Sequence, residues 1–149
     1  MIQVRRARRS DADDITEFQR RMAFETEGVR LDPPTVRRGV RAVFDDPAKG
    51  CYYVAEENGR LLGCTLVIRE WSDWRNGSVL WIHSLYVVPE ARRGGVFTRL
   101  YRYLRRRVER TSRLKGLRLF VDKGNRRAQA AYRAMGMTRD HYHLYEWLK

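Results

Sequence analysis

The stretch LYVVPEARRGGVFTRL, residues 85–100, holds the pattern from which the rest of the chain can be interpreted. An apolar run ends at Pro89, a loop with two arginines and two glycines follows, and a helical pattern begins near Gly95. Backbone N–H groups at the start of a helix form a donor site for phosphate, and glycine lets a ligand approach the main chain closely. The stretch therefore indicates either a phosphate-binding loop or an ordinary turn before a helix.

The periodicity on both sides of this stretch predicts an alternation of strands and helices. Ser10 and the acidic residues after it mark the start of a first helix, and Asn58-Gly59 is typical of a tight hairpin turn. The connection around Asn76-Gly77 leaves the register of its two strands open. We predict the order β, α, α, β, β, β, α, β, α, β, at residues 2–7, 10–28, 32–46, 51–57, 61–71, 78–88, 95–111, 116–122, 125–135 and 138–148.

Composition favours one globular domain over residues 1–149, because 43% of the residues are hydrophobic and no linker or repeat interrupts the chain. No apolar run approaches the roughly 20 residues of a membrane span, and the start has no apolar segment of a signal peptide. We therefore expect a cytoplasmic protein without a membrane partner. Cys51 and Cys64 lie in strand-like stretches and are interpreted as buried, reduced thiols, too few for a structural zinc site.

The charge is strongly basic, with 31 Lys and Arg against 18 Asp and Glu and a net charge of +13. Such a surface attracts polyanions, which include both a polyphosphate cofactor and nucleic acid. The basic residues at positions 102–115 fit a nucleic-acid footprint, but they also fit the solvated face of a helix. Charge alone does not decide between these partners.

Two motifs and the order of elements together resemble the GNAT N-acetyltransferases. The first motif is Arg92-x-x-Gly95 between a strand and a helix, and the second is the segment from Asn125 through Ala128 and Tyr132 to Gly136. The resemblance covers about the whole chain and implies an α/β (α+β) fold, with a mixed central sheet of six to seven strands flanked by four helices. The sequence departs from the family pattern at three positions: Phe97 where Gly or Ala is usual, Met137 where Phe is usual, and Phe120 where many relatives have a general-base Glu.

The resemblance also implies acetyl-CoA as the acetyl donor. Main-chain groups of Leu85, Tyr86 and Val87 are expected to hold the acetyl and pantetheine amides. The pyrophosphate is expected at the loop, and the second motif is expected to contact the cofactor further along. The expected residues there are Arg92, Arg93, Gly94, Gly95, Val96, Phe97 and Thr98 in the loop, and Asn125 and Ala128 in the second motif.

Acetyl transfer to an amine needs a base for the amine, and an acid for the departing thiolate. Tyr132 matches the family's general acid, although it also fits a tyrosine packed on a helix face. His83 is our preferred base, on the strand face of Trp81, Leu85 and Val87, although it also fits a structural histidine. A two-residue turn at Asn76-Gly77 would place Glu70 opposite His83, where Glu70 could orient the imidazole.

The acceptor is predicted only as a primary amine, on a small molecule or on a protein, that is acetylated directly in a ternary complex. Glu25 and Glu27 lie where GNAT enzymes place the acceptor-site wall, and Trp71 and Trp81 are further candidates for this site. Two other interpretations stay open. One is a module that senses CoA or binds nucleic acid without catalysis, and the other is acetylation of an amine on a tRNA or ribosomal partner. The aromatic last strand also leaves a homodimer open.

Overall fold

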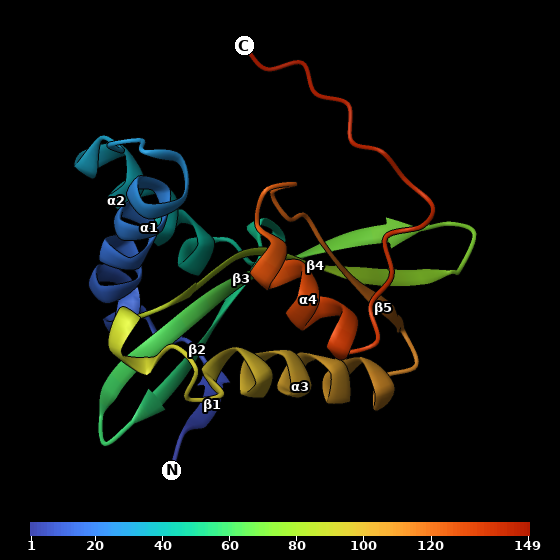
Figure 1. Cartoon of the computed structure of the whole chain (residues 1–149), viewed down its shortest axis with the longest axis horizontal. Helices are drawn as coiled ribbons and strands as arrows, with labels where there is room; N and C mark the ends of the chain where they lie inside the picture. The colour runs from blue at the N-terminus through green and yellow to red at the C-terminus, as the bar shows by residue number, and fades with distance from the viewer. The chain divides into compact units, whose positions relative to one another are not determined.

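The strands form a single sheet in the computed structural model, which describes residues 1–149 (Figure 1). Its order is β1-β2-β3-β4-β5, and only β4 and β5 run parallel. The strands are β1 (Gln3–Arg6), β2 (Cys51–Glu57), β3 (Arg60–Ser72), β4 (Gly77–Val87) and β5 (Leu114–Leu119). The chain divides into two compact units, Met1–Leu119 and Phe120–Lys149, and the whole sheet belongs to the first.

Three helices belong to the first unit and one to the second. They are α1 (Ala12–Glu27), α2 (Pro33–Asp45), α3 (Val96–Glu109) and, in the second unit, α4 (Arg126–Ala134). Adjacent strand residues point to opposite faces of a sheet. The Tyr52 ring lies 5.8 Å from Phe44 of α2, whereas the Tyr53 ring lies 5.6 Å from Tyr103 of α3. The helices α2 and α3 therefore cover opposite faces of the sheet, as Figure 1 shows.

The helix boundaries follow from residues that satisfy the free main-chain groups at helix ends. The Asp32 carboxylate accepts a hydrogen bond from the Thr35 N–H at 3.0 Å and caps α2. Gly28 ends α1 with a φ of 66°, a left-handed conformation that glycine adopts without strain. The predicted start of α1 was two residues early, because a short 3-10 turn at Arg9–Asp11 precedes Ala12.

The predicted last strand is wrong in this structure, and the sheet has five strands instead of six to seven. Residues 138–148 form no helix or strand, and most of their large apolar side chains are exposed. A strand forms where a neighbour pairs with its N–H and C=O groups, and the five-stranded sheet includes no strand from this segment. The predicted strand at 116–122 is also displaced, because β5 spans Leu114–Leu119.

The register of the β3–β4 hairpin contradicts the predicted pairing of Glu70 with His83. Ser72 pairs with Gly77, so the connection holds four residues and Glu70 lies opposite Val79. The pairing then shifts between Leu66 and Val67, which leaves His83 as the extra residue of a β-bulge. The longer turn and the bulge, neither of which the sequence specifies, together account for the difference.

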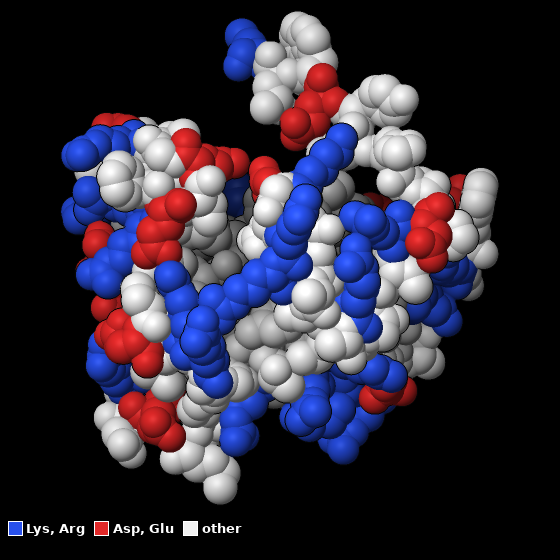
Figure 2. Space-filling model, in the orientation of Figure 1, with Lys and Arg blue, Asp and Glu red and all other residues white.

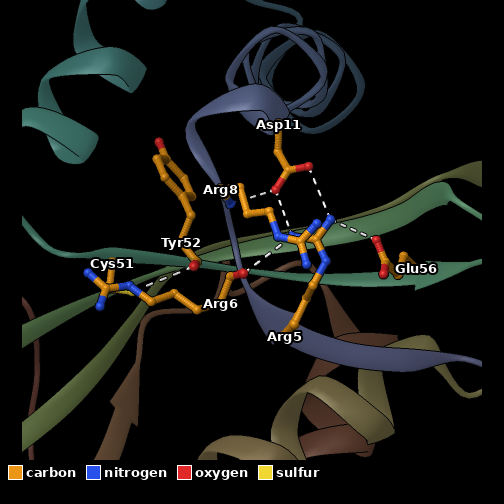
Figure 3. Close-up of polar contacts among 7 residues, drawn as sticks. All are labelled: Arg5, Arg6, Arg8, Asp11, Cys51, Tyr52 and Glu56. Atoms are coloured by element: carbon orange, nitrogen blue, oxygen red, sulfur yellow. Dashed lines mark hydrogen bonds and ion pairs between the residues drawn. The ribbon is translucent and has the colours of Figure 1, made fainter.

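An ion-pair network ties β1 to the start of α1 and to β2 (Figure 3). The Arg5 guanidinium donates to both carboxylate oxygens of Asp11 at 2.8 and 3.1 Å and to Glu56 at 2.7 Å. The Arg8 N–H donates to the Asp11 carboxylate at 2.6 Å. Burial raises the pKa of Asp11, but the hydrogen bonds from Arg5 and Arg8 outweigh it and hold this pKa below its usual range. The charged form of Asp11 therefore stabilises the fold.

Replacing Asp11 with Asn is expected to lower the free energy of unfolding by about 1–3 kcal/mol at pH 7, because the half-buried Arg5 loses one of its two charged partners. A lowered carboxyl pKa stabilises the folded state above the unfolded-state value near ~4 and ceases to do so as the pH falls. The difference between the two proteins should therefore shrink from pH 7 toward pH ~3 in urea unfolding. Asp13→Asn is the control, because its side chain is 77% exposed. An equal loss in both variants would contradict the role of Asp11.

Candidate active site

The predicted phosphate loop connects β4 to α3 through two tight turns. A 3-10 turn at Pro89–Ala91 follows the strand, and Gly95 precedes the first residue of α3. Arg93 has a φ of 70° and Gly95 a φ of 79°, so the chain takes the left-handed conformation twice within three residues. Such a path turns successive N–H groups toward one side of the main chain.

The start of α3 presents N–H groups without main-chain acceptors. The helix's first main-chain hydrogen bond joins the Arg99 N–H to the Gly95 carbonyl at 3.0 Å. The N–H groups of Arg93, Gly95, Val96 and Thr98 donate to no main-chain carbonyl. The expectation for Gly94 needs a correction, because its N–H donates to the Ala91 carbonyl at 3.1 Å and closes the turn. Four of the six predicted amides are therefore available to an anion.

A second feature of this region is the open edge of β4. The parallel pairing of β4 with β5 ends at Ile82 and Leu119, but β4 continues to Val87. Residues 84–87 therefore pair with β3 only, and on their other side no strand of the sheet adjoins them. In an antiparallel ladder every second residue directs its N–H and C=O away from the partner strand. Leu85, Tyr86 and Val87, predicted to hold acetyl and pantetheine amides, lie on this edge.

Arg92 is fixed by three contacts on its own unit. Its Nε donates to the Val87 carbonyl at 2.9 Å, and its Nη2 forms an ion pair with Glu25 at the end of α1. The guanidinium also lies over the Tyr86 ring, 5.6 Å from its centroid, and the Tyr86 hydroxyl donates to Glu25 at 3.2 Å. Burial, together with the Glu25 carboxylate, raises the pKa of Tyr86. Glu25 thus joins the first helix to the loop.

If the loop holds acetyl-CoA, as the resemblance implies, replacing Glu25 with Gln is expected to raise the KM for acetyl-CoA about threefold with little change in kcat, because an exposed ion pair contributes up to about 1 kcal/mol. Glu27→Gln, one residue beyond Thr26 on the same helix end, should leave both constants unchanged. Steady-state kinetics with acetyl-CoA as the varied substrate measures the difference. An increase only in the KM of the acceptor would instead place Glu25 in the acceptor site.

Glu70 accepts hydrogen bonds from two side chains, and neither of them is His83. Its carboxylate accepts hydrogen bonds from the Trp81 indole N–H at 2.6 Å and from Arg118 of β5 at 2.9 Å. The Arg118 guanidinium also lies 6.0 Å from the Trp81 ring centroid. Sequence reasoning missed Arg118, although a lone arginine within the apolar strand run of β5 was a usable signal. The cluster fixes the Trp81 ring.

The remaining predicted residues of the first unit are solvent-accessible. His83 is exposed at the bulge, and Trp71, near the end of β3, is 64% exposed. Glu27 is exposed at the end of α1. The bulge interrupts the strict alternation of β4, so the single face expected for Trp81, His83, Leu85 and Val87 is not continuous.

The second unit carries the second motif on α4. Asn125 precedes the helix, and its side-chain oxygen accepts the Ala128 N–H at 3.1 Å, so this oxygen serves as a helix cap. Gln129, which sequence reasoning missed, donates to the carbonyls of Asp122 and Lys123 at 3.2 and 2.9 Å and fixes the preceding loop. Tyr132 is half-buried, and burial raises the pKa of its hydroxyl. The hydroxyl is therefore protonated at neutral pH.

The basic residues of α3 form a stripe along the exposed side of the helix, and Figure 2 shows Lys and Arg gathered in this part of the view. Arg105 pairs with Glu109 at 2.9 Å, and the Arg107 guanidinium lies 5.8 Å from the Tyr53 ring centroid. Several other arginines of the helix and the turn after it are exposed and form no ion pair. They are Arg99, Arg102, Arg106, Arg110 and Arg113.

Other groups bear on the chemistry of the site. Cys64 is buried, as predicted, and burial raises the pKa of its thiol to about 12, which disfavours the nucleophilic thiolate. Cys51 was also predicted to be buried, but it is only half-buried. No cluster of three or more His, Cys, Asp or Glu side chains could hold a metal ion. None of the helices is both long and apolar enough for a membrane span.

The whole chain was compared with known protein families, with curated sequences and with solved structures. A family model described as the acetyltransferase (GNAT) family matches residues 12–137. A possible acetyltransferase from Clostridium difficile 630 superposes with a TM-score of 0.93 at 38% identity, covering 100% of this chain and 98% of its own. An aminoglycoside N-acetyltransferase in complex with CoA shares the fold at 10% identity, with a TM-score of 0.80 and coverage of 100% and 95%. No curated protein has a matching sequence.

Proposed function

The chain belongs to the GNAT acetyltransferase family, and from this membership we propose that it transfers an acetyl group from acetyl-CoA to a primary amine. The observation that carries the proposal is the set of N–H groups at the start of α3 that donate to no main-chain carbonyl, those of Arg93, Gly95, Val96 and Thr98, beside the open edge of β4. We take the two units as one acetyltransferase domain over residues 1–149, as the family pattern implies.

The residues at the loop fit the chemistry of a CoA pyrophosphate. Four N–H groups without main-chain acceptors and the charges of Arg92 and Arg93 suit two phosphate groups. The open edge of β4 supplies main-chain donors and acceptors for the amides of the pantetheine arm. By the family pattern, Asn125 and Ala128 would contact the cofactor further along. Because the Asn125 oxygen caps α4, its amide N–H₂ is the group left for such a contact.

The transfer forms a bond from the amine nitrogen to the acetyl carbon and breaks the carbon–sulfur bond of the thioester. The amine must be unprotonated to attack, and it loses a further proton as the amide forms. We assign the removal of this proton to His83, directly or through water. Tyr132 would give its hydroxyl proton to the departing CoA sulfur. The high pKa of Cys64 favours direct transfer over an acetyl-cysteine route through that residue.

Release of CoA thiol in the presence of acetyl-CoA and a panel of amines tests the proposal. The panel should include amino acids, polyamines, aminoglycosides and peptides with basic N-termini, because the fold does not dictate the acceptor. At least one amine should accelerate thiol release above the hydrolytic background and appear as an acetylated product by mass spectrometry. Background rates with every amine, in a protein that binds CoA, would favour a CoA-sensing module instead.

His83→Gln is expected to lower kcat about 100-fold at pH 7, at the low end for loss of a general base. The deficit should shrink as the pH rises toward the pKa of the acceptor amine, because hydroxide and the free amine then replace the base. A pH profile of kcat for both proteins measures this recovery. A deficit that stays constant from pH 7 to pH 9 would indicate a structural role for His83.

The exposed arginine stripe on α3 supports a second candidate function, binding of a nucleic acid through its phosphates. This function would predict retention on RNA that falls steeply with salt, and loss of retention in Arg102→Glu/Arg106→Glu. Arg37→Glu/Arg38→Glu on α2 is the charge-matched control. Equal loss in both variants would indicate a general effect of the +13 charge and contradict a footprint on α3.

A further inference from the structure

The open edge of β4 presents polar and apolar side chains on different faces of the sheet. Tyr86 points toward α1, whose Phe18 ring lies 5.3 Å from the Tyr86 ring. Ser84 lies two residues earlier on the strand and shares this face, whereas Leu85 and Val87 point to the other. Of the side chains that β4 presents along this edge, the polar ones therefore lie on the face of α1.

Gln19 of α1 reaches the same face and meets Ser84 there. Its Nε2 donates to the Ser84 Oγ at 3.4 Å and to the Cys64 Sγ at 3.9 Å. A nitrogen–oxygen distance of 3.4 Å is long, so the bond to Ser84 is weak. The Gln19 Oε1 accepts no hydrogen bond, and the Ser84 hydroxyl donates none. The two side chains therefore keep hydrogen-bonding capacity for a ligand.

The other polar groups on this face satisfy one another. The Tyr86 hydroxyl donates to Glu25 at 3.2 Å, and Glu25 forms an ion pair with Arg92. Gln19 and Ser84 are both half-buried, and a polar group that is removed from water without a full set of partners costs free energy. Their unused capacity thus singles them out among the polar side chains beside the open edge.

The chemistry of an attacking amine matches two such oxygens. A neutral primary amine has one lone pair and two N–H groups. Where two acceptors hold both N–H groups, the lone pair points away from them and is left for the bond to the acetyl carbon. One of the two hydrogens then leaves as the proton that is lost when the amide forms, and the other stays on the amide nitrogen of the product.

We propose that the Gln19 Oε1 and the Ser84 Oγ hold the two N–H groups of a neutral primary amine and direct its lone pair toward the thioester. The inference rests on the proposed function, because it needs acetyl-CoA along the open edge of β4. His83, to which we assign the removal of the amine proton, is the residue before Ser84. A secondary amine has one N–H group and would leave one of the two oxygens without a donor, so the pair selects primary amines.

Rates with a primary amine and with its N-methyl analogue test the proposal. The primary amine is the one of the panel with the fastest thiol release, and the analogue carries one methyl group on the reacting nitrogen. The kcat/KM of the natural chain should favour the primary amine by about 10-fold or more. Gln19→Met and Ser84→Ala should each lower the kcat/KM of the primary amine about 5- to 10-fold, through the loss of one hydrogen bond.

The preference for the primary amine should fall by a similar factor in both variants, because the analogue still finds one oxygen. The KM for acetyl-CoA should stay unchanged. Gln19→Met keeps the bulk of the side chain, so a lower preference there does not come from added space for the methyl group. Ser84→Thr keeps the hydroxyl and should keep the preference.

Thr65→Val is the matched control, because the Thr65 hydroxyl is buried on the other face of the neighbouring strand and has no hydrogen-bond partner. It should leave the kcat/KM of both amines unchanged, and far-UV circular dichroism should show that every variant is folded. Losses in Gln19→Met and Ser84→Ala that are equal for the two amines would indicate a structural role and overturn this proposal alone. A natural chain that acetylates no amine would overturn the proposed function together with it.

Discussion

Replacing Tyr132 with Phe is expected to lower kcat about 100-fold, at the low end of the effect of a general acid. The substitution keeps the aromatic ring and removes only the hydroxyl, so the proton for the departing CoA thiolate is lost. Burial raises the pKa of this hydroxyl, which keeps it protonated at neutral pH. The KM for acetyl-CoA should change little, because the hydroxyl acts on charge that develops in the transition state.

Tyr103→Phe is the matched control, because Tyr103 is a half-buried tyrosine on α3 that packs against Tyr53. Its kcat should stay within about twofold of the natural enzyme, since the substitution keeps the packed ring and removes a hydroxyl that has no proposed part in the transfer. Initial rates of thiol release at saturating substrates measure both variants. A Tyr132→Phe variant with an unchanged kcat would assign the proton to another group and leave Tyr132 a packing role.

The sequence predicted those parts of the fold that depend on local signals. Three helix ends lie at residues that the sequence predicted as boundaries: Asp32 and Pro33 start α2, Gly28 ends α1, and Asn125 caps the start of α4. Asn58 and Gly59 both have positive φ in the hairpin turn, as a two-residue turn needs. These features could be read from single residues because each satisfies a main-chain group a few positions away.

The wrong or missed predictions concern contacts between residues that lie far apart in the sequence. The partner of Glu70 depended on the length of one turn and on a bulge, and a shift of register moves every cross-strand neighbour. Arg118 reaches Glu70 because β5 pairs in parallel with β4. Glu25 reaches Arg92 because the end of α1 lies near the loop. Residues 138–148 have the pattern of a strand, but pairing also depends on a neighbour that the pattern does not specify.

The second large effect is expected at the start of α3, where Phe97→Pro removes one N–H group of the loop. Proline is tolerated in the first turn of a helix, because the N–H there has no partner within the helix. The chain itself contains such a case, since Pro33 and Pro34 occupy the first two positions of α2. Phe97→Ala is the control for the loss of the ring, because it keeps the N–H.

The difference between these two variants isolates one hydrogen bond to a charged phosphate. Such a bond contributes about 1.5–3 kcal/mol, so Phe97→Pro should bind CoA roughly 10- to 100-fold more weakly than Phe97→Ala. Far-UV circular dichroism and thermal unfolding should show that both variants retain the fold. Binding of dephospho-CoA should fall by the same factor, because it keeps the pyrophosphate.

The most direct measurement of the central claim is therefore the Kd of CoA for Phe97→Pro and Phe97→Ala, by isothermal titration calorimetry. If the N–H groups at the start of α3 hold the pyrophosphate, the Kd of the proline variant exceeds that of the alanine variant at least tenfold. Equal Kd values in two folded variants would contradict the claim, because CoA would then bind without this group.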